Sequence, residues 1–310
     1  MRALISQGWG VRALARNQLA VTALEKWGAI PVRGEIKDAA ALRQGMDGSE
    51  VVFHVAAMFK LWGPKKEFEA VNVGGMRALV SAAEATPSVR KIVAVSAAAV
   101  VMGDPAHMMD VDENTPIQTC AFAPYSSSKA EAEKILLAAS GRRPGLETVA
   151  LRPPMIWGAG MPMMQQLVDT VKAGHWQWVD DGKSVISTCH VDNLVDALLL
   201  AADNGRGGEA YFVADKGGRT MKSIFVGLLA TRGVKAGEKS IGFGAAWIFA
   251  GVMSVVWRIF RLKGEPPITR QLLRFVGKSF TVRTDKAQHE LGYAPRITWQ
   301  QGVAEMVAPA

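Results

Sequence analysis

The chain has 310 residues, enough for one large α/β core with an appended region or for two small domains. Because 49% of the residues are apolar and 21% are charged, the composition is globular and argues against extended disorder. The formal net charge is +8, yet no run of Lys and Arg interleaved with aromatic residues favours nucleic acid. We therefore expect no nucleic-acid partner, while a phosphate-bearing cofactor and an anionic membrane surface both stay open.

The thiols and imidazoles give no metal-site pattern. Cys120 and Cys189 lie far apart, which predicts two free thiols in a reducing, cytoplasmic compartment. His54 and His107 have no paired ligands, so we expect no metal site. The apolar start of the chain is interrupted by Gly8 and predicts no secretory signal.

In the first half of the chain, predicted strands and helices alternate. We predict strands at 11–15, 30–32, 50–55, 91–95 and 148–152, and helical segments at 2–6, 17–27, 68–85 and 124–137. The strands at 50–55 and 91–95 are continuous apolar runs, as expected for strands buried on both faces. This alternation predicts an α/β fold with a parallel, doubly wound sheet.

Beyond Pro154 the alternation loosens and helices dominate. We predict helices at 162–172, 191–202 and 222–232, with short strands at 185–188 and 210–213. No internal repeat, low-complexity segment or flexible linker separates this part from the first. The C-terminal region should therefore pack tightly against the sheet.

Tyr125 and Lys129 are the strongest candidates for chemistry. They lie four residues apart in one predicted helix, so their side chains share a face. A phenol ordinarily titrates near pH ~10, and an adjacent ammonium lowers that pKa. Tyr125 could then exchange a proton with an alcohol or carbonyl. A lone pair at this spacing is usually a packed Tyr beside a solvated Lys, so the surrounding motifs decide.

Those motifs resemble one enzyme family. Residues 124–133 (PYSSSKAEAE) are similar to the active-site helix of the extended short-chain dehydrogenases, and they follow Ser96, near where that family carries a hydroxyl. Within the family, the chain most resembles the 3β-hydroxysteroid and sterol dehydrogenase branch. Further resemblances occur in order at 54–57 (HVAA), 71–73 (VNV), 151–158 (LRPPMIWG), 190–193 (HVDN) and 286–295 (KAQHELGYAP).

The resemblance implies a Rossmann-type fold and NAD or NADP as cofactor. It implies a dinucleotide-binding domain over 1–158, to which 185–214 return, and a substrate-binding region over 159–184 and 215–310. Tyr125 would be the general acid/base, Lys129 would hold the nicotinamide ribose, and Ser96 would orient the substrate oxygen. The cofactor-binding residues that it implies are Arg16, Glu35, Ile36, Ala56, Ala57, Lys129 and Pro153.

The chain departs from the family pattern at its start. Family members open with a strand, a G-x-x-G-x-x-G loop for the pyrophosphate and a helix, and this sequence begins inside that helix. The missing strand would lie between those at 11–15 and 51–55. Three interpretations follow: a fragment or misassigned start, a relative that no longer binds cofactor, or two neighbouring strands that close the gap. We favour the first, because the other motifs are intact, and expect these residues alone to bind dinucleotide poorly.

A second departure concerns the hydroxyl partner. Alignment of the strand without gaps places Ala97 at the family's Ser or Thr position and Ser96 one residue earlier. Adjacent strand residues point to opposite faces, so Ser96 serves only if the strand has ended or bulged there. Otherwise the hydroxyl comes from elsewhere or is missing.

The residue that follows the strand at 11–15, which corresponds to the family's second strand, bears on the choice between NAD(H) and NADP(H). NAD-dependent members commonly place an acid there, whereas this chain has Arg16, whose guanidinium can pair with a 2′-phosphate. The structural alternative is an exposed Arg at a strand end. Glu35 and Ile36 stand where the family contacts adenine. The pattern favours NADP(H) over NAD(H) without excluding NAD(H).

The segment 240–263 points to a lipophilic substrate. It has no charge from Ser240 to Trp257 and then carries Arg258, Arg261 and Lys263. A buried helix, an interfacial helix and a lid over the substrate site all fit this pattern. Peripheral membrane contact and a homodimer are therefore both open as partners.

We predict reversible hydride transfer between NAD(P)(H) and a secondary alcohol or ketone on a hydrophobic, steroid-like substrate. One alternative is a nucleotide-sugar epimerase or dehydratase, which would need cations such as Arg258 or Arg274 for a diphosphate. The other is a non-catalytic dinucleotide-binding protein, which the retained Tyr125 and Lys129 argue against.

Overall fold

The computed structural model describes residues 1–307, and the chain alternates at first between strands and helices. The strands β1 and β2 pair in parallel as a separate two-stranded sheet, with Arg12 opposite Ile30. The helix α2 begins where the Asn17 side chain accepts a hydrogen bond from the Ala20 amide. These first elements are α1 (Arg2–Ser6), β1 (Arg12–Ala15), α2 (Gln18–Lys26), β2 (Ile30–Arg33) and α3 (Ala39–Met46).

The main sheet has four parallel strands in the order β11-β6-β4-β3. Its central strands, β4 and β6, consist largely of buried apolar residues, as predicted for strands covered on both faces. The order shows crossovers between strands distant in sequence, which is the doubly wound arrangement. The strands are β3 (Val51–His54), β4 (Lys91–Val95), β6 (Glu147–Arg152) and β11 (Ala210–Phe212).

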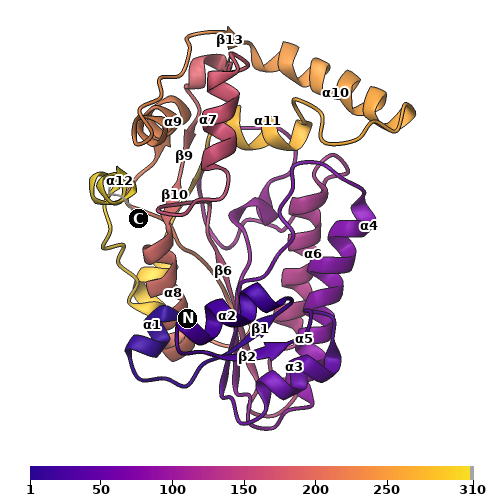
Figure 1. The fold of residues 1–310 in the computed structure, drawn as a ribbon, viewed down its shortest axis with the longest axis vertical. Coiled ribbons are helices and arrows are strands. Elements are labelled where there is room, and N and C mark those ends of the chain that lie inside the picture. Colours follow the sequence, from indigo (N-terminus) through magenta and orange to yellow (C-terminus); the bar gives the residue numbers. More distant parts are fainter. Residues whose placement is uncertain (308–310) are drawn as a thin grey trace.

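Helices cover both faces of this sheet (Figure 1). On one face, α5 and α6 pack Leu79 and Leu136 against Ile92 of β4. On the other face, α8 packs Leu194 and its neighbours against β4 and β6. The covering elements are α4 (Lys65–Phe68), the π-helical turn η1 (Glu69–Val73), α5 (Gly74–Glu84), α6 (Pro124–Ala138) and α8 (Val191–Asn204).

The two sheets do not join. Within residues 1–307, β1 pairs only with β2, and β3 pairs along one edge only, with β4. The interpretation in which the neighbouring strands close the gap is therefore wrong. The Arg12 guanidinium instead donates to the carbonyl of Asp47, and α3 packs on both β1 and α5, which keeps the two sheets at a distance.

The C-terminal region forms a second layer beyond the carboxyl ends of the main strands (Figure 1). It contains the sheet β12-β9-β14-β5, in which β12 runs antiparallel to β9, and two pairs, β10-β7 and β13-β8. The strands are β5 (Met108–Val111), β7 (Met155–Trp157), β8 (Trp178–Val179), β9 (Val185–Ile186), β10 (Thr188–His190), β12 (Arg219–Thr220), β13 (Ser240–Ile241) and β14 (Phe280–Val282).

Helices contain more residues of this region than strands do, as predicted. Among the described residues, no helix is both long enough and apolar enough to cross a bilayer. The sequence predictions missed β5 and β14, which pair across about half of the chain. The helices are α7 (Met164–Lys172), α9 (Met221–Ala230), α10 (Phe243–Ile259), α11 (Arg270–Val276) and α12 (Trp299–Val307), with the turns η2 (Ala98–Val101), η3 (Asp180–Gly182) and η4 (Ala287–Leu291).

Candidate active site

The helix α6 carries both residues of the predicted catalytic pair. Pro124 occupies the start of the helix, where a missing N–H costs nothing. Tyr125 follows in the first turn, and Lys129 lies one turn later on the same side. The helix packs against β6 and η2, so the pair lies near the carboxyl ends of the main strands.

Tyr125 is held by contacts from distant parts of the chain. Its ring meets the edge of Phe59 with the ring centroids 4.8 Å apart. Its backbone N–H donates to Oε1 of Gln271 at 3.1 Å, and the Gln271 amide donates to the carbonyl of Lys60 at 3.0 Å. Gln271 is fully buried in α11, so this helix fixes both Tyr125 and the loop after β3. Sequence reasoning missed Gln271, because no local pattern marks it.

Lys129 is buried, and its ammonium is directed at the main sheet. Its Nζ donates to the carbonyl of Val95, at the end of β4, over 2.7 Å. Burial lowers the pKa of Lys129 to about 8, and the carboxylate of Glu133 partly opposes that shift. An ammonium has three N–H donors, so two remain for groups other than the Val95 carbonyl.

A buried ion pair supports the same helix. Glu133 accepts hydrogen bonds from Nε and Nη2 of Arg152, at 3.0 and 2.5 Å, and both side chains are almost fully buried. Arg152 also lies over the ring of Phe212. The pair joins α6 to β6 one turn beyond Lys129, and it supplies the negative charge that Lys129 faces. The sequence motif at 151–158 contained Arg152 without indicating its partner.

The pKa of Tyr125 shifts in the direction opposite to our expectation. Burial raises it to about 12. The Lys129 ammonium does not counteract this, because it binds the Val95 carbonyl rather than the phenol. Tyr125 is therefore protonated at neutral pH, as an ordinary phenol is, and so can donate a proton.

Asn72 fixes the loop that follows β3. Its Oδ1 accepts from the Met58 amide at 2.7 Å, and its Nδ2 donates both to the Met58 carbonyl and to Oγ of Ser128. Ser128 lies between Tyr125 and Lys129 in α6. The VNV motif thus ties the exposed Ala56 and Ala57 of the HVAA motif to the catalytic helix.

Ser96 lies at the end of β4 with its hydroxyl buried. Its N–H still pairs with the carbonyl of Leu151 at 2.7 Å, while Oγ has no hydrogen-bond partner among the described residues. The next residues, 97–99, are alanines in the cluster against which Tyr125 packs. The segment beside the phenol therefore presents methyl groups, and Ser96 carries the nearest hydroxyl along this strand.

The remaining cofactor candidates fall into two groups. Pro153 directly follows β6 and is buried. Its carbonyl accepts from the Ala98 amide at 2.9 Å, so it lies beside the alanine segment 97–99. Arg16 and Glu35 are exposed at the carboxyl ends of β1 and β2, and the half-buried Ile36 packs on Gly75 of α5. The structure places this second group on the far side of the gap.

These groups suit the two ends of a dinucleotide. Lys129 has free donors for ribose hydroxyls, and Arg16 offers an exposed guanidinium for a phosphate. The described residues do not form a cradle for the pyrophosphate. Within residues 1–307, no glycine-rich turn leads into a helix at the gap between β1 and β3. The residues that are present fit the ends of the cofactor and not its middle.

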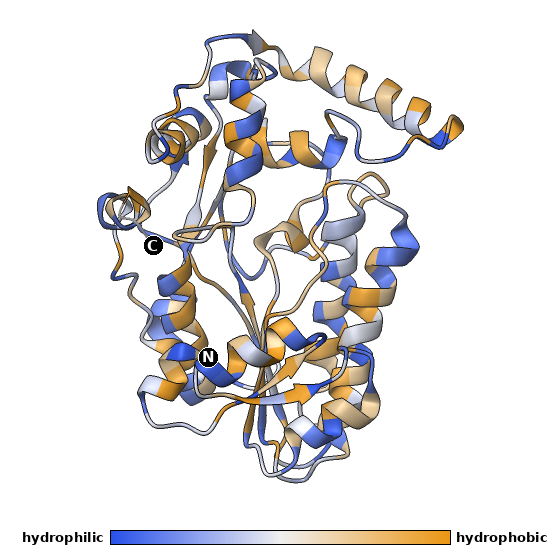
Figure 2. Ribbon diagram, in the orientation of Figure 1, coloured by the Kyte–Doolittle hydropathy of each residue, from blue (hydrophilic) through white to orange (hydrophobic). Residues whose placement is uncertain are grey.

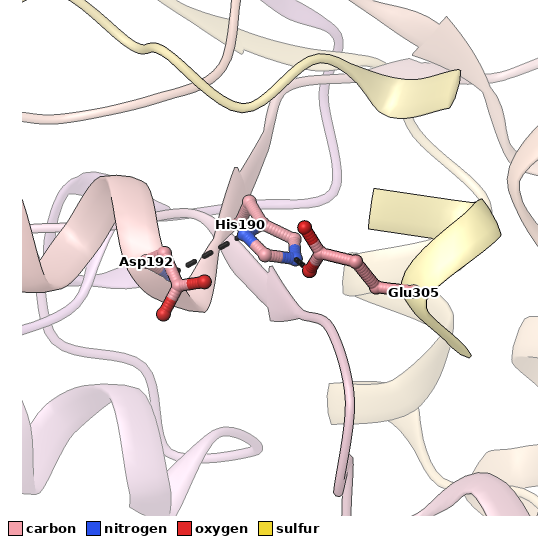
Figure 3. Close-up of side chains that lie close together, drawn as sticks. All are labelled: His190, Asp192 and Glu305. Atoms are coloured by element: carbon pink, nitrogen blue, oxygen red, sulfur yellow. Dashed lines mark hydrogen bonds and ion pairs between the residues drawn. The ribbon is translucent and has the colours of Figure 1, made fainter. Parts of the chain in front are cut away.

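A cluster of His190, Asp192 and Glu305 lies apart from α6 (Figure 3). Nδ1 of His190 accepts from the Asp192 amide at 3.3 Å and so caps α8, while Nε2 lies 3.8 Å from a carboxylate oxygen of Glu305. Figure 3 shows the two carboxyl groups at opposite sides of the imidazole ring. His190 therefore packs at the start of α8.

Residues 3–239 match the 3-beta hydroxysteroid dehydrogenase/isomerase family. The chain belongs to this family. It is 38% identical over 304 residues to "4-hydroxy-2-methyl-3-oxo-4-farnesyl-3,4-dihydroquinoline-1-oxide ketoreductase" of Stigmatella aurantiaca, covering 98% of this chain and 90% of the relative. A 2-alkyl-3-oxoalkanoate reductase of Stenotrophomonas maltophilia is 30% identical, with 99% and 94% covered.

Solved structures agree in fold. The crystal structure of gox2253 superposes with a TM-score of 0.78 at 27% identity, covering 99% of this chain and 92% of that one. A UDP-glucose 4-epimerase from Thermotoga maritima, with UDP-glucose, gives a TM-score of 0.76 at 20% identity, with 98% and 92% covered. At that identity the second likeness shows the fold alone. The chain is an NAD(P)-dependent oxidoreductase of the extended short-chain type.

Proposed function

We propose that the protein reduces a ketone on a hydrophobic, ring-bearing substrate with NAD(P)H, and that Tyr125 donates the proton. The observation that carries the proposal is the position of Tyr125 and Lys129 on one side of α6, where Lys129 binds the carbonyl at the end of β4 and keeps two donors for a cofactor. The relatives named above are a ketoreductase and an oxoalkanoate reductase, which supports reduction. The reverse oxidation uses the same groups, with Tyr125 as the base.

In this mechanism each residue has one task. NAD(P)H, held in part by Lys129, would supply the hydride for the carbonyl carbon. Oη of Tyr125 gives its proton to the carbonyl oxygen, so that the ketone becomes a secondary alcohol. Lys129 would bind the nicotinamide ribose through the two donors that the Val95 carbonyl leaves free. Ser96 orients the substrate oxygen with the only hydroxyl at the end of β4.

For the cofactor we propose NADP(H) in preference to NAD(H). The exposed Arg16 follows β1 and can pair with a 2′-phosphate, while no acidic residue lies beside it in the chain to bind ribose hydroxyls. The remaining contacts that we assign to the cofactor come from the adenine side and from the catalytic side, namely Glu35, Ile36, Ala56, Ala57 and Pro153.

We assign substrate binding to residues 159–184 and 215–310, and dinucleotide binding to 1–158 together with 185–214. Residues 240–263, including α10, would contact a membrane surface peripherally, and a homodimer through the same face is the competing arrangement. The epimerase alternative is less well supported. Arg274 is buried against Met108, so it offers no open diphosphate site.

Replacing Tyr125 by Phe tests the reaction. The substitution removes the proton donor and keeps the ring that packs on Phe59, so turnover of a lipophilic ketone with NADPH should fall about 10²–10⁴-fold. Cofactor binding, measured by fluorescence, should change little. Tyr211→Phe is the matched control, because that phenol binds Glu290 away from α6.

Two results would overturn the proposal. One is a Tyr125→Phe protein whose turnover stays within about threefold of the parent, since loss of a general acid costs far more. The other is a parent protein that binds dinucleotide and turns over no ketone, which would favour a non-catalytic binding protein.

A further inference from the structure

The helix α10 has its side chains arranged the opposite way from an ordinary surface helix. Its small residues face the protein, where Ala246 and Ala250 are fully buried against Leu273 of α11. Its large apolar residues face outward at i, i+4, i+7 and i+11, with exposed fractions of 68%, 54%, 54% and 68% for Ile248, Val252, Val255 and Ile259. Figure 2 shows this helix as an almost entirely apolar element at the margin of the molecule.

Cations lie at both ends of this apolar face. Arg258, Arg261 and Lys263 follow at its C-terminal end. At the other end, Nζ of Lys278 lies 4.0 Å from the ring centroid of Phe243. The helix spans about 26 Å at 1.5 Å per residue and carries no acidic residue, so apolar and cationic groups share one side of the molecule.

Alongside α10 lies a groove of about 640 Å³, and Ile248, Val252 and Val255 of the exposed apolar face form part of its wall. Its walls are mostly apolar, from Trp62, Phe122 and the α10 valines, and none of the lining residues is acidic. Two guanidiniums line it. That of Arg258 lies 5.3 Å from the ring centroid of Trp62, and that of Arg270 lies 5.1 Å from the ring centroid of Trp247.

The Arg270 guanidinium is fixed in place without a polar partner for Nε. It packs against Gly251, where an added Cβ would come within 2.5 Å of Nη2, so the glycine provides the room. Nε of Arg270 is buried and has no hydrogen-bond acceptor among the described residues. A guanidinium stacked on an aromatic ring keeps its in-plane donors free, and these match the oxygens of a phosphate group.

We propose that this groove binds an anionic phospholipid, with the phosphate at Arg258 and Arg270 and the acyl chains along the exposed apolar face of α10. The proposal rests on the membrane contact of residues 240–263 suggested above and adds the lipid class. Charge complementarity selects a lipid surface over a second copy of the chain, because a second copy would bring the same cations face to face.

Vesicle flotation tests this proposal. The 310-residue protein should float with vesicles of phosphatidylcholine mixed with phosphatidylglycerol far more than with phosphatidylcholine alone. Arg258→Gln combined with Arg270→Gln should weaken binding to the mixed vesicles about tenfold or more at low salt. Arg77→Gln, at an exposed position on α5, is the control for the loss of one charge. Val252→Asp should abolish flotation, and Val226→Asp on α9 is its control.

A soluble probe separates recognition of the headgroup from insertion. Titration with dihexanoyl phosphatidylglycerol should change the tryptophan fluorescence of the parent protein and not that of the double Arg variant, whose fold is checked by circular dichroism. Equal flotation with both kinds of vesicle would overturn the groove site and leave the membrane contact standing. No flotation, together with a dimer in solution that Val252→Asp dissociates, would overturn both in favour of self-association. Turnover of a water-soluble ketone is measured separately, so failure here is distinct from failure of the reductase proposal.

Discussion

The two parallel sheets at the N-terminal side of the molecule differ in how completely they are covered. In the four-stranded sheet, β4 and β6 are buried between α5, α6 and α8. In the two-stranded sheet, Leu14 of β1 is 37% exposed and Ile30 of β2 is 58% exposed. Parallel strands of one chain are therefore covered on both faces in one sheet and partly exposed in the other.

The two sheets also carry different groups of candidate site residues. Tyr125, Lys129 and Pro153 all gather around the well-covered sheet, whereas Arg16 and Glu35 stand on the two-stranded sheet across the gap. Proton transfer needs fixed geometry, and buried strands provide it. The lesson is that the residues assigned to proton transfer and those assigned to the adenine side of the cofactor lie in regions of very different burial.

The largest stability effect should come from the ion pair behind Lys129. Arg152→Met leaves the buried Glu133 carboxylate without its partner, which should lower the free energy of unfolding by about 3–5 kcal/mol. The double variant Arg152→Met/Glu133→Leu removes both charges and should recover much of that loss. Urea denaturation measures both. Additive losses in the double variant would show that the two residues act independently.

A matched pair of substitutions sharpens the contrast between the sheets. Leu151→Ala in β6 removes a fully buried side chain and should cost about 2–5 kcal/mol of unfolding free energy. Leu14→Ala in β1 removes a partly exposed one and should cost less than about 1 kcal/mol. Both are measured by denaturant unfolding. Equal losses would mean that the two-stranded sheet is as well supported as the other.

His54 should make the well-covered sheet sensitive to acid. Burial, with a smaller contribution from the Lys129 charge, lowers its pKa from 6.5 to about 4. Between those values the unfolded chain binds the extra proton, so stability falls as the pH drops through this window, by up to about 3 kcal/mol. Unfolding curves of the parent and of His54→Gln, recorded from pH 7 to pH 4.5, should diverge. Parallel pH profiles would contradict the assignment.

Local sequence was sufficient for the elements that bear the chemistry. Pro124 and the Tyr125–Lys129 spacing predicted α6, and the apolar runs predicted β3, β4 and β6 within a residue or two. These features depend on short-range signals that the chain carries in a few consecutive residues.

Long-range contacts could not be predicted. Gln271 lies 146 residues from the Tyr125 amide that it binds, and β5 and β14 are short strands that pair across a similar distance. The pKa of Tyr125 was expected to be lowered, because the spacing alone placed Lys129 near the phenol. The spacing could not show that the ammonium would bind the Val95 carbonyl instead.

Docking on a membrane through the outward face of α10 would change which substrate concentration sets the reaction rate. A lipophilic ketone partitions into the bilayer, so an enzyme docked through this face searches for it in two dimensions and not in bulk water. The quantity that sets the rate is then the mole fraction of ketone in the lipid. Added lipid that contains no substrate dilutes the ketone within the surface, and the rate falls although the total concentration in the tube is unchanged.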